Sequence, residues 1–342
     1  MNSVLMKRTI FILLALALCG AGALAQDGEI VYVDYPEVEI KRPGGVAILA
    51  DFGDALRAGD SVITTRFGEA EIELADGGTV SIARDTVYQI QVIESGGAPQ
   101  TVMSVAIGAV RFKFNTIAGR REPVVGAPTA VAGVRGTEFT TYVAPDGATV
   151  FVVDEGMVDV SAEGGMVQLV GGQGVEVMPG ERPGEPFDAL QRAFDFSSYN
   201  DERMSELLRN PERAVIGHTR RLAEFADQIE ILIPLYEEHK ALLDAANTKL
   251  ATLEGDARQT FFENELVPVR AQTATYFNNM RFYGLSGLSL RRYVLGRMYL
   301  LLSLEYIDTP ADTTYRGFLT AYDEALAIYE HRIVPVLDPS DL

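Results

Sequence analysis

The stretch that decides the fold class spans residues 70–82 and reads Ala-Glu-Ile-Glu-Leu-Ala-Asp-Gly-Gly-Thr-Val-Ser-Ile. Apolar and polar residues alternate on both sides of its Asp-Gly-Gly triplet, and this period of two is typical of β-strands with one buried face. Asp-Gly and Gly-Gly pairs favour the tight turn between antiparallel strands. The stretch therefore predicts a β-hairpin that buries Ile72 on one strand and Val80 on the other.

The alternation recurs through the first half of the chain, for example at residues 88–92 and 111–114. Residues 150–153 are apolar at every position, which indicates a strand covered on both faces. Further turn pairs lie at Asp146-Gly147 and Gly164-Gly165. We therefore predict an all-β domain of many short strands, folded as a sandwich or a roll.

Glycine usage changes near residue 186. Residues 26–186 hold 24 glycines, whereas residues 187–342 hold six. The segment between the two halves, residues 179–186, is rich in proline and glycine, which is typical of a linker. We place the linker at residues 181–186, with the β domain before it and an all-α domain over residues 187–342. The predicted fold class is α+β multidomain.

The second half shows apolar residues at alternating spacings of three and four, the pattern of packed helices. One run extends from Val215 to Leu253, and Pro234 inside it predicts a kink or a break. Another run covers residues 262–283, and a last helix is expected to begin at Thr309-Pro310-Ala311-Asp312. These helices predict a helical bundle.

A helix-pair repeat is the alternative to a bundle. It rests on three similar motifs, Leu232-Ile233-Pro234-Leu235, Leu266-Val267-Pro268-Val269 and Ile333-Val334-Pro335-Val336. Pro268 follows Pro234 after about one length of a helix-pair unit, and Pro335 follows Pro268 after about two.

The chain of 342 residues has 29 basic and 48 acidic side chains, which gives a formal net charge of −19. Such an acidic protein has no general attraction for phosphate backbones, so a nucleic-acid partner is not expected. Its one cysteine, Cys19, excludes a disulfide framework and a cysteine-rich zinc site.

The N-terminus has the pattern of a signal peptide, residues 1–25. Lys7 and Arg8 precede an apolar run, and Ala23-Leu24-Ala25 forms an A-x-A cleavage site. A lipoprotein acylated at Cys19 is the alternative. Because Leu285 to Ile307 is interrupted by arginines, no transmembrane span is expected in the mature chain. The expected location is the periplasm or the medium.

The sequence contains none of the common motifs for catalysis, cofactor binding or metal binding. No nucleophile elbow, P-loop or EF-hand spacing occurs. His218, His239 and His331 are interpreted as packing or surface residues rather than metal ligands. We therefore predict no catalytic, cofactor-binding or metal-binding residues and a non-enzymatic protein. An enzyme or carrier acting on envelope polymer, with a carboxylate pair such as Asp154 and Glu155, is the alternative, although adjacent strand residues point to opposite faces.

Several motifs of the β half occur in a recognisable order. They begin with Gly59-Asp60-Ser61-Val62 and the hairpin of residues 74–82, and they continue with Gly133-Val134-Arg135-Gly136-Thr137-Glu138-Phe139. Glu155-Gly156 and Gly171-Gly172-Gln173 follow. Together they resemble the FecR domain, known from bacterial iron-uptake regulators and other envelope proteins, over about residues 46–180. The resemblance covers nothing in residues 187–342.

The resemblance implies a module outside the inner membrane that brings no catalytic residues. We expect it to serve binding, assembly or sensing, while the helical domain contacts an envelope protein or a second copy of the chain. A regulator in trans-envelope signalling is a further alternative.

The motif residues are expected to be structural: Gly133, Arg135, Gly136, Thr137, Glu138, Phe139, Glu155, Gly156, Gly172 and Gln173. Glycines inside a strand indicate a β-bulge or a close backbone approach. A bulge would turn Arg135 inward, where Glu138 or Glu155 would be its nearest carboxylate. The alternative is that Arg135 and Glu138 hold a ligand.

The A-x-A site predicts a mature chain that begins at Gln26. Intact-mass analysis of protein from the envelope fraction should give the mass of residues 26–342. A mass that includes Met1, or a lipid adduct on Cys19, would contradict this prediction.

Overall fold

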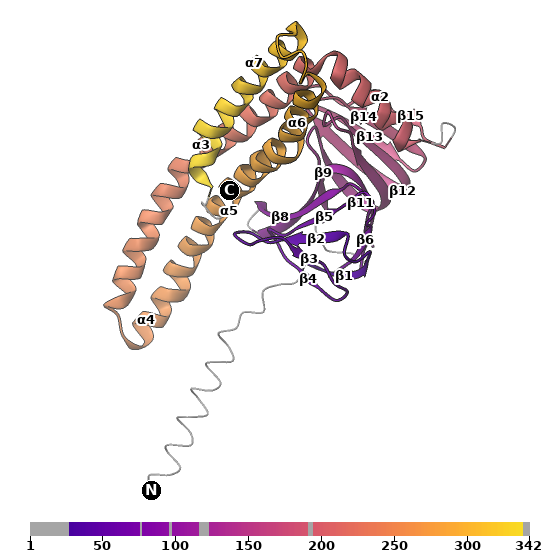
Figure 1. Cartoon of the computed structure of the whole chain (residues 1–342). Helices are drawn as coiled ribbons and strands as arrows, with labels where there is room; N and C mark the ends of the chain where they lie inside the picture. The colour runs from indigo at the N-terminus through magenta and orange to yellow at the C-terminus, as the bar shows by residue number, and fades with distance from the viewer. Residues whose placement is uncertain (1–26, 76, 96–97, 116–122, 191–193, 338–342) are drawn as a thin grey trace.

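The protein is described by a computed structural model that covers residues 27–75, 77–95, 98–115, 123–190 and 194–337. A strand-rich N-terminal region is followed by a helical C-terminal region (Figure 1), and this confirms the predicted order of the two parts. The predicted signal peptide and Cys19 lie outside the described residues.

The strands form one hydrogen-bonded network of 15 strands. Its members are β1 (Gly28–Val33), β2 (Val38–Lys41), β3 (Ile48–Leu49), β4 (Ala55–Leu56), β5 (Ser61–Thr64), β6 (Ala70–Leu74), β7 (Thr79–Ile82), β8 (Val87–Ser95), β9 (Ala98–Lys113), β10 (Val124–Gly126), β11 (Val131–Val143), β12 (Thr149–Ala162), β13 (Gly165–Val170), β14 (Gln173–Val177) and β15 (Phe187–Asp188). Strands β1 and β2 precede residue 46, so the sheet begins earlier than the motifs that predicted it.

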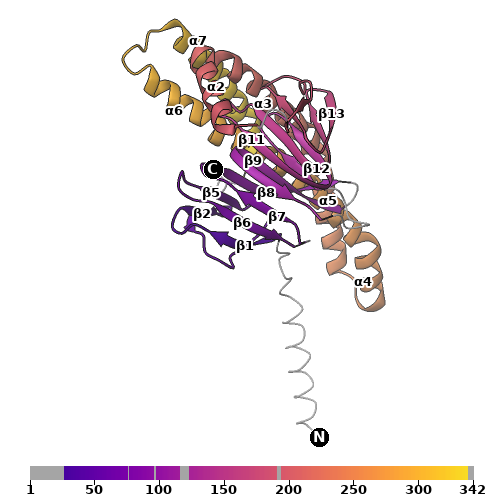
Figure 2. The ribbon, with the colours of Figure 1, turned by 90° about the vertical axis from the view of Figure 1, so that its right-hand side faces the viewer.

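The network branches at the long strand β9. Its N-terminal part pairs with β8 and β10, and its C-terminal part pairs with β7 and β11. In Figure 2 the arrows of β9, β11 and β12 run side by side across the middle of the molecule. Because β9 belongs to both branches, the strands enclose one apolar core.

The hairpin expected from residues 70–82 is present. β6 and β7 pair antiparallel with Ile72 opposite Val80, and both side chains are fully buried. In the same core, Phe112 of β9 stacks on Phe139 of β11 with 5.2 Å between ring centroids. Period-two alternation therefore located the inward face of these strands correctly.

The helices are long and closely connected. They are α2 (Phe196–Arg209), α3 (Pro211–Ala251), α4 (Gly255–Phe261), α5 (Val267–Ser289), α6 (Gly296–Glu305) and α7 (Thr313–Ile328), with π-helical segments η1 (Phe262–Leu266), η2 (Leu290–Leu295) and η3 (Tyr329–Ile333) and a 3-10 turn η4 (Val334–Val336). Because η1 and η2 continue α4 into α5 and α5 into α6, these elements form one continuous helical rod. Figure 1 shows α3 and α5 side by side in a long hairpin whose tip lies at α4.

Two details of the helical prediction are corrected by the structure. Helix α3 continues through Pro234 without a break, and Ile229 and Tyr236 on either side of it pack in the helical core. The expected kink at Pro234 stays a prediction. The last helix is capped by Asp312 rather than Thr309, since the Asp312 carboxylate accepts a hydrogen bond from the Thr314 amide at 2.7 Å. With 41 residues, α3 is longer than the helices of a helix-pair repeat.

The turn between β11 and β12, residues 144–148, is buried beneath the helices, and we call it the Asp146 turn. The Asp146 carboxylate is 1 % exposed and accepts from Arg203 Nε of α2 at 2.8 Å. Its second oxygen accepts from the Ala148 amide at 3.0 Å. Burial alone would lower the pKa of Arg203, but its bonds to Asp146 raise it. The buried carboxylate of Asp146 is therefore paired with the charged guanidinium of Arg203.

Helix α3 contacts the same turn through His218, whose Nε2 lies 2.8 Å from the carbonyl oxygen of Asp146. A carbonyl only accepts, so Nε2 carries the proton and donates. A Cβ on Gly147 would lie 2.4 Å from this ring, so the contact requires glycine there. Nearby, a Cβ on Gly217 would lie 2.3 Å from the carbonyl oxygen of Pro179. The β region and the helices are thus closely packed at two places.

Burial of His218 makes the stability of the folded protein depend on pH. Burial lowers the pKa of its imidazole, while the bond to the Asp146 carbonyl opposes that shift. Because the unfolded chain then takes up the proton at a higher pH than the folded protein, stability is complete above about pH 6.5 and is lost as the pH falls toward the folded pKa. A His218→Gln variant, whose amide can still donate, should lose less stability over this range.

The measurement is urea unfolding of both proteins at pH 7.5 and pH 5.0. His239 and His331 are present in both proteins and serve as the internal control. An equal loss of stability in the two proteins would contradict the prediction.

Candidate functional site

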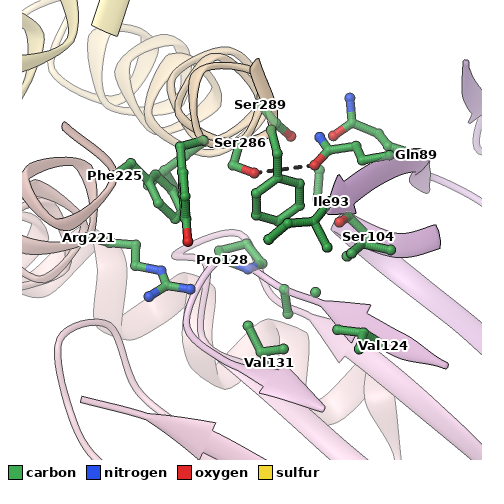
Figure 3. A pocket seen from close by; sticks show the side chains of 18 of the residues that line it. Gln89, Ile93, Ser104, Val124, Pro128, Val131, Arg221, Phe225, Ser286 and Ser289 are labelled. Atoms are coloured by element: carbon green, nitrogen blue, oxygen red, sulfur yellow. Dashed lines mark hydrogen bonds between the residues drawn. The ribbon is translucent and has the colours of Figure 1, made fainter. Parts of the chain in front are cut away.

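A cavity of about 550 Å³ lies where the strands face the helices, and we call it the interdomain cavity. One wall comes from β8, β9 and β10, and the other from α3, α5 and η2. Figure 3 shows side chains from both walls pointing toward the space between them. This volume is in the range of sites that bind small ligands.

Glutamine and serine side chains form the polar part of the strand wall. Because successive strand residues point to opposite faces, Tyr88 and Ile90 enter the core while Gln89 and Gln91 face the helices. Gln91 is 5 % exposed, and its Oε1 accepts a hydrogen bond from Ser286 Oγ of α5 at 3.3 Å. The strand wall thus presents uncharged amides.

The helix wall carries a cation and an aromatic ring. Arg221 and Phe225 lie four residues apart on α3, so they share one face of the helix. The Arg221 guanidinium carbon lies 4.7 Å from the centroid of the Phe225 ring, and its Nη1 donates to Glu224 Oε2 at 2.7 Å. Arg221 is therefore held at the edge of the cavity by stacking and by an ion pair.

Two residues of the cavity lining each carry a polar atom that is buried from solvent and has no hydrogen-bond partner among the described residues. The two atoms are Gln89 Oε1, an acceptor, and Arg221 Nε, a donor. The amide nitrogen of Gln89 donates to Ser61 Oγ at 3.1 Å, so this side chain is anchored at one end only. Buried unpaired polar atoms are uncommon in native proteins, and both atoms lie in residues that line the cavity.

The carboxylates of the lining are engaged by arginines. Glu224 accepts from Arg221, and Asp227 accepts from Arg332 Nη2 at 2.6 Å. Among the described residues no group of three or more His, Cys, Asp or Glu side chains is arranged to hold a metal ion. The two lining acids are therefore engaged in ion pairs with arginines.

The motif residues of β11 and β12 lie on a bulge. The register between these strands shifts between Arg135 and Glu138, and Gly136 and Gly156 both have positive φ angles, 51° and 88°. A Cβ on Gly156 would lie 2.6 Å from the Gly136 carbonyl oxygen, so the two backbones approach closely. Thr137 Oγ1 donates to the Met157 carbonyl oxygen at 2.9 Å and spans the bulge.

Glu138 pairs with cations of β9. Its carboxylate lies 2.5 Å from Arg111 Nη2 and 3.5 Å from Lys113 Nζ. The side chain of Arg135 lies outside the described residues, so its proposed partner stays a prediction. Glu155 is exposed and stands opposite Glu138 in the strand register.

The remaining motif residues make backbone and core contacts. Phe139 is fully buried in the core. Gly172 has a φ of 86° and donates its amide to the Val153 carbonyl oxygen at 2.7 Å, while Gln173 Oε1 accepts from the Val170 amide at 3.1 Å. Of the motif residues whose side chains are described, none lines the interdomain cavity.

Other sequence candidates also lie elsewhere. Asp154 is exposed on β12 and pairs with Arg111 at 3.2 Å. His239 and His331 each bond a carbonyl oxygen one helical turn earlier, at 3.0 and 2.8 Å. No described helix is long and apolar enough to cross a lipid bilayer.

The cavity itself was missed by sequence analysis. Gln89 and Gln91 alternate with Tyr88 and Ile90, a pattern that indicates a solvated strand face. Nothing in that pattern distinguishes water from a helix as the covering layer. The one signal that was available is the unusual choice of amides, rather than charges, on that face.

Comparison with protein families gives one match. Residues 60–159 match the family model described as FecR protein, and this confirms the resemblance expected from the motifs. The match begins just before β5 and ends within β12, so it includes the strand wall of the cavity and excludes the helices. No curated protein matches the chain.

Solved structures give distant matches. A Parabacteroides distasonis protein provisionally described as an anti-sigma factor matches 39% of this chain at 18% identity, with a TM-score of 0.32. The match spans 63% of that chain, which is less than two thirds of its length. A second structure of a protein with the same description matches at 17% identity, over 39% of this chain and 62% of that one, with the same TM-score.

The bulge provides a stability prediction. Gly156→Ala should lower the free energy of unfolding by about 2 kcal/mol, because its backbone is left-handed and the new Cβ meets the Gly136 carbonyl oxygen. Gly133→Ala is the control, since no atom lies within 4 Å of its added Cβ, and the change should stay within about 0.5 kcal/mol. Urea unfolding monitored by circular dichroism measures both values. Equal effects in the two variants would contradict the structural interpretation of the motif.

Proposed function

We propose that this chain, whose residues 60–159 form a FecR-family region, is a non-enzymatic sensing module in trans-envelope signalling. The observation that carries the proposal is the position of the interdomain cavity. Its strand wall lies in the FecR match and its helix wall lies outside it. A ligand that contacts both walls would therefore report its presence by holding the two parts together.

The proposed place of action is the periplasm or the medium, reached after cleavage at Ala25. The support is the A-x-A pattern and the family resemblance. A regulator located there needs a protein partner to pass its signal on.

The partner is proposed to contact the helical domain. Helix α6 and the turn after it expose Leu300, Leu304 and Ile307, which are 59%, 60% and 68% exposed. Their spacing of four and three places them along one side of the helix. Large apolar side chains gathered on an exposed face are typical of protein contact sites. Contact with a second copy of this chain is the other possibility for the same surface.

The enzyme alternative has less support. The acids that would have served it, Asp154 and Glu155, lie on the exposed part of β12, away from the cavity. The two acids that line the cavity are paired with Arg221 and Arg332. A proton-transferring pair needs a free acid and a free base in one cleft.

The test uses protein purified from its own envelope fraction. Native mass spectrometry should detect a bound adduct on the wild type, and hydrogen exchange should be slower at both β8 and α5 in the loaded form. Ser104→Leu, which fills the cavity from β9, should lose the adduct and the protection. Ser81→Leu on β7 is the control, because Ser81 also lies on a strand but outside the cavity.

An adduct that survives Ser104→Leu would contradict the proposal. So would protection that is confined to one wall, or a wild-type protein with neither adduct nor protection.

A further inference from the structure

We infer that a second, smaller cavity between the strands and the helices binds a phosphate group. We call it the Lys41 cavity; its volume is about 50 Å³, and the charged residues of its described lining are Lys41, Arg42 and Arg292. It lies beside the interdomain cavity and shares Gln89 and Ser289 with that lining. The inference goes beyond the proposed function, because it concerns another cavity and another ligand.

Strand pairing places Lys41 on the face of the sheet that the helices cover. Lys41 of β2 stands opposite Ser61 of β5, and Ser61 stands opposite Gln89 of β8. Residues directly opposite one another in antiparallel strands point to the same face, so these three side chains form one row. Gln89 Nε2 donates to Ser61 Oγ at 3.1 Å along this row. The neighbouring residue Ile40 points the other way and is fully buried in the core.

Packing of η2 brings Arg292 to the same face. The next residue, Tyr293, packs against a small apolar cluster that contains Val87. Val87 lies two residues before Gln89 on β8, so both point toward the helices. Burial lowers the pKa of the Lys41 ammonium group, and the nearby charge of Arg292 lowers it further. Two positive charges, one from the strands and one from the helices, therefore meet at this cavity.

The described lining of the Lys41 cavity holds no Asp or Glu. Asp60 lies outside that lining, and its Oδ2 accepts a hydrogen bond from the Arg57 amide at 3.0 Å. Burial raises the pKa of Asp60, and the charge of Arg42 is among the causes that oppose this shift. Because Arg42 already interacts with Asp60, we expect Lys41 and Arg292 to be the main contacts of the ligand. An anion between two like charges would be attracted to both of them.

The size and charge of the cavity favour a small oxyanion. A buried water needs about 10–15 Å³ of such volume, so about four waters, or one group of similar size, fit within it. A phosphate group is of this size, carries a charge of about −1.5 to −2 at pH 7, and is a common ligand of Arg and Lys. The hydroxyls of Ser61 and Ser289 also line the cavity and can donate to further phosphate oxygens.

A bound phosphate would strengthen the contact between the two parts of the chain. In the empty cavity Lys41 on the strand side and Arg292 on the helix side repel each other. With a phosphate between them, both side chains are attracted to the same ligand. Phosphate should therefore stabilise the folded protein through this cavity.

The experiment titrates the purified protein by isothermal calorimetry at constant ionic strength. The probes are inorganic phosphate, glycerol 3-phosphate and acetate. We expect a phosphate probe to bind with a Kd below about 1 mM, and acetate, with one charge and two oxygens, to bind at least about tenfold more weakly. Binding of inorganic phosphate would identify the free ion as a sufficient ligand. Binding of glycerol 3-phosphate alone would identify the end group of a larger molecule.

Two variants each remove one of the charges. Lys41→Met keeps most of the side-chain length on the strand side, and Arg292→Gln removes the guanidinium on the helix side. Each should weaken phosphate binding about tenfold. Arg297→Gln is the matched control, because Arg297 lies on the following helix α6, is exposed and does not line the cavity. Near-UV circular dichroism and melting temperature verify that each variant is folded.

Lys41→Met also separates a ligand-binding role from a structural one. Without phosphate this variant should unfold at an equal or higher urea concentration than the wild type, because the repulsion from Arg292 is removed. In about 5 mM phosphate the wild type should gain stability, and the variant should gain less.

The inference is overturned if neither phosphate probe binds up to about 10 mM, or if acetate binds as tightly as phosphate. It is also overturned if folded Lys41→Met and Arg292→Gln proteins bind phosphate like the wild type, or if phosphate stabilises Lys41→Met as much as the wild type. Ser104 does not line the Lys41 cavity, so Ser104→Leu should keep phosphate binding. Failure of this inference can therefore be distinguished from failure of the proposed function.

Discussion

The arrangement of the molecule depends on the burial of one hairpin turn beneath two helices. Asp146 brings a carboxylate into a site that is 1 % exposed, and Arg203 of α2 and the Ala148 amide are the groups that match it. Removing one partner while the other stays buried costs about 3–5 kcal/mol, so in the packed arrangement Asp146 and Arg203 each require the other. His218 adds a bond from α3 to the same turn. Three elements distant in sequence are thereby fixed at one point.

The contacts at the Asp146 turn also position the helix wall of the interdomain cavity. Arg221 follows His218 by one helical turn on α3, and Val294, which lines the cavity, also lies against Gly147. The distance between the helix wall and the strand wall is therefore determined where the Asp146 turn is held. The FecR motif contributes differently, because its bulge shapes β11 and β12 without reaching the cavity. Residues within the FecR match thus shape the sheet, while helices α3, α5 and η2, which lie outside the match, complete the cavity.

Sequence analysis located the elements better than their contacts. Alternation found the β6–β7 hairpin, and the three-four spacing found the stripe of α3, whose members Val215, Leu222 and Ile229 are buried. Asp146-Gly147 was predicted as a turn, because turn chemistry is local. Its burial depends on Arg203 and His218, which lie 57 and 72 residues further along the chain. The same limit applies to the amides of β8, since local pattern does not tell which layer covers a strand. Pro234 does not end α3, whose residues pack in the helical core on both sides of it, and local sequence does not reveal that packing.

The proposed coupling between the two walls requires one ligand that contacts both of them. A ligand shifts an equilibrium only by the difference in its affinity for the two states, so a ligand bound to one wall alone would leave their association unchanged. Gln89 belongs to the strand wall and Arg221 to the helix wall, and a single ligand contacts both walls only when they are together. Its binding energy then adds to that of the Asp146 turn in holding the parts closed. Under the proposed function, occupancy of the cavity would be read as rigidity of the interface between the two parts.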